Sequence, residues 1–202
     1  MRRRTEQREE GRQDFFTISI SDLMASLLAI FILAICYFIL NFSQATAQLT
    51  QNDVKRAELL MLIHEQLEQD GIRVSVDEQH GILRISEGVL FDVGEAEVKP
   101  EGRRVLFKIA SLVRDKVPAV AVEGHTDATP LLGGIYRDNW GLSAMRAAVV
   151  ASYLEQDGGF DPLKLQAVAF GPNQPMVPND TPEHRALNRR VEIVFLSEYP
   201  KR

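Results

Sequence analysis

The longest apolar run in the chain lies near its N-terminus, where the residues from 23 to 40 carry no formal charge. Together with the preceding Ile18 and Ile20, this run reaches the roughly 20 apolar residues that the hydrocarbon layer of a bilayer requires. We therefore predict one membrane-spanning helix over residues 15–40. It carries a single carboxylate, Asp22, close to its start. An ionisable group in such a helix is costly, so it usually faces protein or water and has a function.

The flanks of this segment predict its orientation. Five arginines fall within residues 2–12, whereas the first basic residues after the segment are Lys55 and Arg56. This asymmetry predicts a cytoplasmic N-terminus and a domain outside the membrane. A cleaved signal peptide is the alternative, because Ala45 and Ala47 form a weak cleavage pattern. The apolar run is longer than the usual signal-peptide core of about 7–15 residues, which favours a retained helix.

Residues 41–71 are mostly polar, and we predict that they form a helical connector. Leu60, Ile63 and Leu67 recur at helical spacing within it. Leu60 and Leu67 are seven positions apart, a spacing that permits pairing of this helix between two copies of the chain. The predicted organisation is then a basic cytoplasmic tail over residues 1–14, the span, the connector, and a domain over residues 72–202.

Beyond residue 72, strand-like alternation gives way to a regular succession of helices and strands. Two alternating stretches with Gly81 in the turn between them predict a hairpin. The order that follows is helix, strand, helix, strand, short helix and final strand, which predicts an α+β sandwich with a mixed sheet and helices on one face. The expected strands are 72–76, 82–86, 119–123, 165–170 and 191–196, and the expected helices begin at 100, 140 and 183.

Composition narrows the function further. The net charge of -5 gives no support for nucleic-acid binding through bulk charge. Cys36 is the single cysteine, so no disulfide can form within one chain. His125 lies between Glu123 and Asp127, but the sequence has no second histidine at metal-ligand spacing. We therefore expect no metal site, no cofactor and no enzymatic activity.

Four ordered blocks resemble the OmpA-like peptidoglycan-binding domain. They are the lead-in over residues 91–102, Glu123-Gly-His-Thr-Asp127, Asn139-Trp-Gly-Leu-Ser-Ala-Met-Arg146 and Asn188-Arg-Arg-Val-Glu192. The resemblance implies that the domain grips the diaminopimelate side chain of the wall's stem peptide, which ends in an ammonium and a carboxylate. One fixed anion and one fixed guanidinium suit such a group.

The same resemblance implies roles for individual residues. Asp127 is expected to hold the ammonium and Arg146 the carboxylate, with hydrogen bonds from Asn139 and the helix start. The remaining expected contacts are Thr126, Leu142, Asn188 and Arg189, of which the last two belong to a block that can also brace the site. The loop over residues 128–138 looks longer than the simplest version in this family, which leaves the choice of ligand variant open.

The membrane segment has a resemblance of its own. The stretch from Ser21 to Leu33 looks like the Asp-Leu-Met segment of MotB-like stator B subunits, in which the aspartate carries ions. This implies that Asp22 passes protons or sodium ions in the inner membrane. It also implies a homodimer within a ring of a polytopic MotA-like A subunit, so that ion flow drives rotation.

Three settings for such a subunit remain open. The short connector resembles the compact stator-like B subunits of Zorya anti-phage systems, which favours a role in defence. The first alternative is a flagellar stator that serves motility. The second is a passive tether between the inner membrane and the cell wall, which would need the span only as an anchor.

Overall fold

The computed structural model of the chain describes the backbone of residues 2–131 and 135–197, and the side chains of residues 23–47, 51–131 and 135–197. The chain divides into two compact units, Met1–Thr50 and Gln51–Arg202. Helix α1 (Arg2–Gln69) contains most of the first unit and begins the second.

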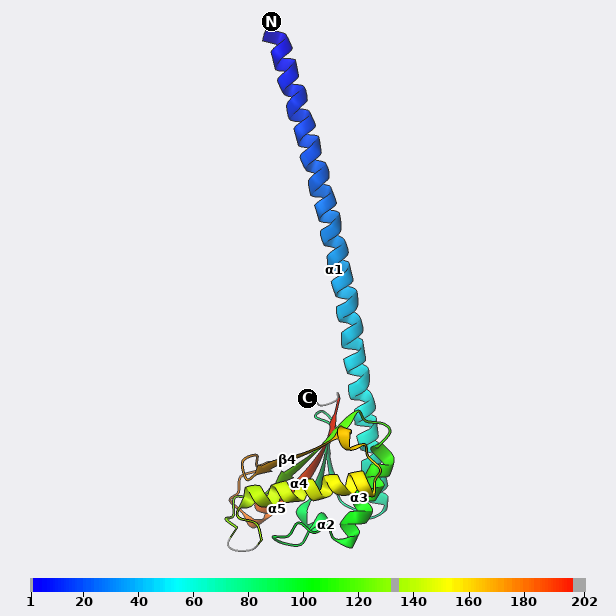
Figure 1. The fold of residues 1–202 in the computed structure, drawn as a ribbon, viewed down its shortest axis with the longest axis vertical. Coiled ribbons are helices and arrows are strands. Elements are labelled where there is room, and N and C mark those ends of the chain that lie inside the picture. Colours follow the sequence, from blue (N-terminus) through cyan, green and yellow to red (C-terminus); the bar gives the residue numbers. More distant parts are fainter. Residues whose placement is uncertain (1, 132–134, 198–202) are drawn as a thin grey trace. The chain divides into compact units, whose positions relative to one another are not determined.

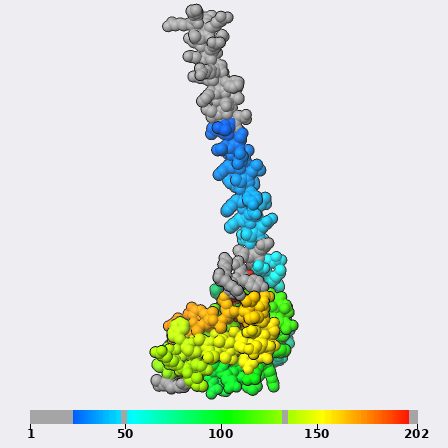
Figure 2. Space-filling model, in the orientation of Figure 1, coloured from blue at the N-terminus to red at the C-terminus, as the bar shows by residue number. Residues whose placement is uncertain are grey.

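The described part of the first unit is an apolar helix. All of its described side chains, residues 23–47, are exposed (Figure 2). Its most apolar window has a mean hydropathy of 2.8 with no residue buried, so by length and composition α1 contains a segment able to cross a membrane. Asp22 lies within α1, but its side chain, like those of the basic tail, lies outside the described residues.

The second unit is built on a five-stranded mixed sheet with the order β1-β2-β5-β3-β4 (Figure 1). The β3–β4 pair is parallel and the other pairs are antiparallel. The predicted hairpin is confirmed, with Gly81 at a φ of 74° in its turn, but its first strand begins at Ser75 and not at the expected residue 72. The strands are β1 (Ser75–Asp77), β2 (Ile82–Ser86), β3 (Ala119–His125), β4 (Leu165–Gly171) and β5 (Arg190–Leu196).

Helices cover one face of this sheet, as the alternation of segments predicted. The longest of them, α4, packs on β3 and β4, and α3 lies beside it (Figure 1). Asp138 caps the start of α4 by accepting a hydrogen bond of 2.8 Å from the Gly141 N–H. The helices are α2 (Glu87–Leu90), α3 (Pro100–Val113), α4 (Asn139–Gln156) and α5 (Pro182–Asn188), with a short 3₁₀ helix at Pro162–Lys164.

The last turns of α1 belong to the core of the second unit. Leu60, Ile63 and Leu67 are fully buried in the same apolar cluster as the sheet and α3. Lys108 of α3 donates a hydrogen bond of 2.8 Å to the Gln66 carbonyl. The compact unit thus begins at Gln51, before the expected connector ends. Because Leu60 and Leu67 are already buried, they are not available for pairing between two copies.

Candidate functional site

The expected site forms where β3 ends. The Thr126 N–H donates to the Gly171 carbonyl at 2.9 Å, which holds the chain beside β4 for one more residue. The next residue, Asp127, turns the chain, because its Oδ1 accepts a hydrogen bond of 2.9 Å from the Thr129 N–H. Its carboxylate is thereby fixed at the sheet edge, with a side chain that is 9% exposed.

The start of α4 closes over this turn. Asn139 donates from Nδ2 to the carbonyl oxygens of Thr129 at 2.9 Å and of Asp127 at 3.3 Å. Leu142 is buried, and the Ser143 hydroxyl accepts a hydrogen bond from the Gly171 N–H at 3.1 Å. Asn139 therefore braces the Asp127 turn through its backbone, and Leu142 contributes apolar packing.

Arg146 is almost completely enclosed, with a side chain that is 2% exposed. Its terminal nitrogen pairs with Oε1 of Glu87 at 2.5 Å, and its Nε donates to the Glu95 carbonyl at 2.8 Å. The guanidinium also lies over the Phe91 ring, 5.1 Å from its centroid. A buried guanidinium held on several sides in this way is a rigid positive group.

Arg189 joins Arg146 to Asp127 through Glu87. Its Nε pairs with Oε2 of Glu87 at 2.8 Å, and its terminal nitrogen pairs with Oδ2 of Asp127 at 2.6 Å. The four residues form a row of alternating charge, Asp127–Arg189–Glu87–Arg146, which we call the ion row. Arg189 is the most accessible member, with 35% of its side chain exposed.

Glu87 was not predicted from the sequence. It follows β2 directly and belongs to none of the four blocks that resemble the OmpA-like domain. The only signal in the sequence was its position immediately after a predicted strand. The ion row nevertheless depends on it, because it holds both guanidiniums.

Asn188 acts as a brace. It is fully buried, and its Oδ1 accepts hydrogen bonds from the N–H groups of Met176 at 2.8 Å and Val177 at 3.1 Å. Its Nδ2 donates to the Val177 carbonyl at 2.8 Å and to Oδ1 of Asn179 at 2.9 Å. These bonds fix the loop before α5 and thus the position of the neighbouring Arg189. Within the 128–138 loop, residues 132–134 lie outside the described part of the chain.

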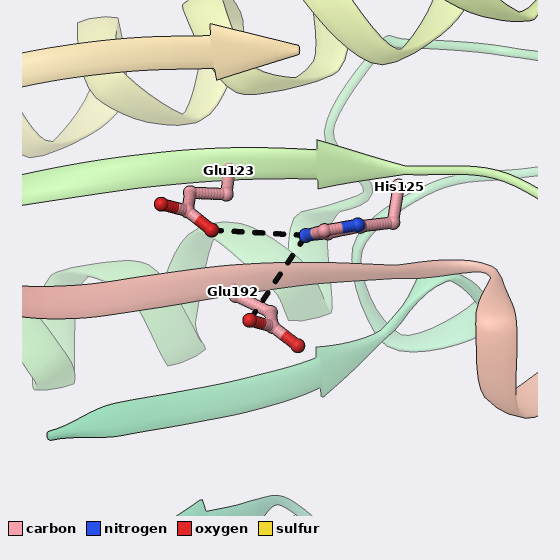
Figure 3. A group of neighbouring side chains, drawn as sticks. All are labelled: Glu123, His125 and Glu192. Atoms are coloured by element: carbon pink, nitrogen blue, oxygen red, sulfur yellow. Dashed lines mark ion pairs between the residues drawn. The ribbon is translucent and has the colours of Figure 1, made fainter. Parts of the chain in front are cut away.

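A second group of charged side chains lies on the face of the sheet that is opposite α4. Oε1 of Glu192 accepts hydrogen bonds from Nε of Arg190 at 2.6 Å and Nε of Arg84 at 3.0 Å. Burial raises the pKa of Glu192, but its hydrogen bonds to Arg190 and Arg84 and the neighbouring positive charges together outweigh burial and hold that pKa below the usual value. On β1, a hydrogen bond from Arg84 lowers the pKa of Asp77 from 3.8 to about 2. Glu123 and His125 adjoin Glu192 on this face (Figure 3).

Comparison with known proteins agrees with this architecture. A model of the OmpA family matches residues 90–189. The uncharacterized protein YtxE of Bacillus subtilis is 39% identical over 119 residues, covering 59% of this chain and 49% of that protein. Motility protein B of the same species is 31% identical over 116 residues, covering 57% of this chain and 44% of that protein. The chain thus spans about half the length of the curated relatives it matches.

A solved structure gives the same fold. The cell wall anchor of the T6SS from Pseudomonas aeruginosa superimposes with a TM-score of 0.62 and 32% identity. The match covers 69% of this chain and 97% of that one.

Proposed function

Residues 90–189 form an OmpA-like domain, and on this basis we propose that the chain is a membrane-anchored subunit that binds peptidoglycan. The observation that carries the proposal is the ion row, which holds two carboxylates and two guanidiniums in fixed positions at one edge of the sheet. The ligand group is the free end of a diaminopimelate side chain, with its ammonium and its carboxylate.

A zwitterion fits the ion row because it leaves no charge unpaired. The ligand ammonium takes the place of Arg189 on Asp127, and the ligand carboxylate takes the place of Glu87 on Arg146. The pair between Arg189 and Glu87 is kept. The ligand ammonium and the ligand carboxylate thus extend the row by one charge at each end, and each of the six charges has a partner of opposite sign. The row has two carboxylates and two guanidiniums and is therefore neutral, so a ligand with only one charge would leave a net charge in this largely enclosed cluster, which is costly.

Arg189 is the entry point in this scheme. It is the most exposed member of the row, and it must release Asp127 before an ammonium can bind. Arg146 is enclosed, so its guanidinium becomes accessible only when Glu87 moves from it. Asn139 and Asn188 keep the surrounding turns in place during this exchange.

Sedimentation with purified sacculi tests the proposal. The full chain in detergent should pellet with sacculi, and Asp127→Asn or Arg146→Gln should remove most of that binding. Each substitution leaves one ligand charge without its partner, a loss of about 2–5 kcal/mol for a desolvated pair. Asp115→Asn is the matched control, because that aspartate is 85% exposed and pairs only with its neighbour Arg114 among the described residues. Equal pelleting of all four folded proteins would exclude the assignment.

Competition by small molecules tests the charge requirement separately. Free diaminopimelate should release the bound chain from sacculi, since each of its ends carries both an ammonium and a carboxylate. 1,5-Diaminopentane, which keeps the ammonium groups but lacks the carboxylates, should release much less. Equal release by the two compounds would show that only Asp127 is used.

We further propose that the chain works as the B subunit of an ion-driven motor in the inner membrane. One polypeptide combines an apolar helix able to cross a membrane with an OmpA-like domain, which suits a subunit that couples a membrane event to the wall. In this proposal the N-terminus is cytoplasmic and the domain periplasmic. Asp22 passes protons or sodium ions, and defence against phage is the setting, with flagellar motility as the alternative.

A single helix with one carboxylate cannot enclose an ion path, so the proposal requires partners. These are a polytopic A subunit and a second copy of this chain. Purification in mild detergent from the native host should recover a complex that contains two copies of this chain and a polytopic protein. A monodisperse monomer under several detergent conditions would leave a passive tether to the wall as the remaining function.

A further inference from the structure

Three potential metal ligands meet on the sheet face opposite α4. Glu123 and His125 project from β3 to this face, because alternate residues of a strand share a face. Glu192 reaches it from the neighbouring strand β5, where it is paired directly with Glu123. One ligand atom from each of the three side chains lies within 4.8 Å of the others (Figure 3).

His125 is buried, with a side chain that is 1% exposed. Among the described residues, neither of its ring nitrogens has a hydrogen-bond partner. Its ring stacks on Phe170, with centroids 5.1 Å apart, and Nε2 points between the two carboxylates (Figure 3). Nε2 lies 3.8 Å from Oε2 of Glu123 and 4.0 Å from Oε2 of Glu192. Both distances are too long for a hydrogen bond.

The two oxygens of Glu192 have separate partners. Oε1 accepts the hydrogen bonds from Arg84 and Arg190, whereas Oε2 is turned toward His125. Glu192 is therefore held in place by one oxygen and presents the other. For Glu123, the only ion pair within the described residues is the one with His125.

We propose that Glu123, His125 and Glu192 bind a divalent transition metal of the zinc type. Two ligands at about 2.1 Å from a tetrahedral metal stand roughly 3.4 Å apart. The observed separations of 3.8 and 4.0 Å exceed this by about half an ångström, which small side-chain rotations can close. A metal between the three groups also supplies the partner that Nε2 lacks.

The chemistry of the ligands selects the metal. An imidazole nitrogen with two carboxylate oxygens suits zinc, whereas calcium and magnesium prefer oxygen ligands alone. The local charge also favours a cation, since the three carboxylates of Asp77, Glu123 and Glu192 outnumber the two guanidiniums, those of Arg84 and Arg190, that pair with this group among the described residues. Glu123 is 21% exposed, which gives the ion a route from solvent.

The bound metal would cross-link two strand ends of the wall-binding site. His125 ends β3 two residues before Asp127, and β5 begins at Arg190, next to Arg189. The metal site itself does not depend on wall binding, because it lies on separate residues and is measured with zinc alone.

Calorimetric titration of the full chain tests the proposal. The protein, purified in detergent without a histidine tag and stripped by a chelator, should bind one equivalent of Zn²⁺ and should not bind Ca²⁺ at that site. His125→Gln and Glu123→Gln should each weaken zinc binding by at least about tenfold. The matched control is His184→Gln. His184 also pairs with a carboxylate, that of Asp180 at 2.5 Å, but its side chain is 40% exposed. It should retain full zinc affinity.

Nitrogen-15 NMR of the histidine rings provides the second measurement. Zinc should shift the His125 ring signals and leave those of His80 and His184 unchanged. Unchanged zinc affinity in folded Glu123→Gln would overturn the proposal, even if His125→Gln failed to fold. So would His125 ring signals that stay unchanged when zinc is added, since the imidazole is one of the three assigned ligands.

Discussion

Gly124 of β3 lies directly against the backbone of Ser143 in α4, and a Cβ on Gly124 would stand 2.2 Å from the Ser143 carbonyl oxygen. This contact sets the distance between the strand that leads to Asp127 and the helix that carries Arg146. Gly124→Ala should therefore force the two elements apart and lower the free energy of unfolding by about 1–3 kcal/mol or more.

Urea unfolding followed by the fluorescence of Trp140, the chain's only tryptophan, measures this change. Gly141→Ala is the control, because its added Cβ would meet only the Asp138 carboxylate at 3.6 Å. A Gly124→Ala protein as stable as Gly141→Ala would show that the close approach is not required.

Removing the charge of Glu87 should be the most disruptive change in the ion row. Glu87→Gln leaves the enclosed Arg146 without its carboxylate, and breaking a buried ion pair costs about 3–5 kcal/mol. Glu97→Gln is the matched substitution, since Glu97 is 84% exposed and faces Arg103 at 3.9 Å. That exposed pair should contribute less than about 1 kcal/mol. Thermal unfolding of both variants gives the comparison, and similar melting temperatures would contradict the structural role of Glu87.

Asp77 should contribute to the acid sensitivity of the domain. Its pKa in the folded protein is about 2, below the value of 3.8 for the free group, so the folded state favours the ionised form. The stabilisation from its pair with Arg84 is complete above pH 3.8 and is lost as the pH falls toward about 2. Asp77→Asn should make stability less dependent on pH across this interval. Urea midpoints at several acidic pH values test this, with Asp115→Asn as control, and parallel curves for wild type and Asp77→Asn would contradict it.

Asp22 provides the test of ion transport. If it carries ions, a titratable carboxylate is required at that depth, so Asp22→Asn should assemble normally but lose phage protection or motility. Asp22→Glu keeps the chemistry and moves it by one methylene, so it should retain part of the activity. Asp14→Asn makes the same chemical change outside the predicted span and should have no effect. Full activity of Asp22→Asn would show that Asp22 does not carry ions and only lies at the edge of the membrane.

The order of strands and helices followed from local patterns. Alternation predicted the hairpin, and helical spacing together with Pro100 predicted α3. The strands beginning at 119, 165 and 191 were expected from the succession of segments between the helices. The structure extends β3 by two residues to His125, which places Asp127 immediately beyond the sheet edge. These features could be predicted because each depends on residues close together in the sequence.

The arrangement of the site could be predicted only in part. The recognised blocks placed Asp127, Arg146 and Arg189 near one another, but the burial of Arg146 depends on Glu87, which comes from a different part of the chain. Likewise, the approach of Glu192 to His125 follows from the pairing of β3 with β5. The last turns of α1 were expected to be a connector because few of their residues are apolar. The structure shows that those few, Leu60, Ile63 and Leu67, pack in the core of the domain.

The burial of Leu60, Ile63 and Leu67 has a mechanical consequence. Any force that reaches Gln51 along the chain acts on the core of the domain itself, because the last turns of α1 are part of that core. A pull along α1 must slide its apolar face past its neighbours as a unit and break the bond between Lys108 and the Gln66 carbonyl. The domain is therefore built to bear tension in shear, where many contacts share the load at once.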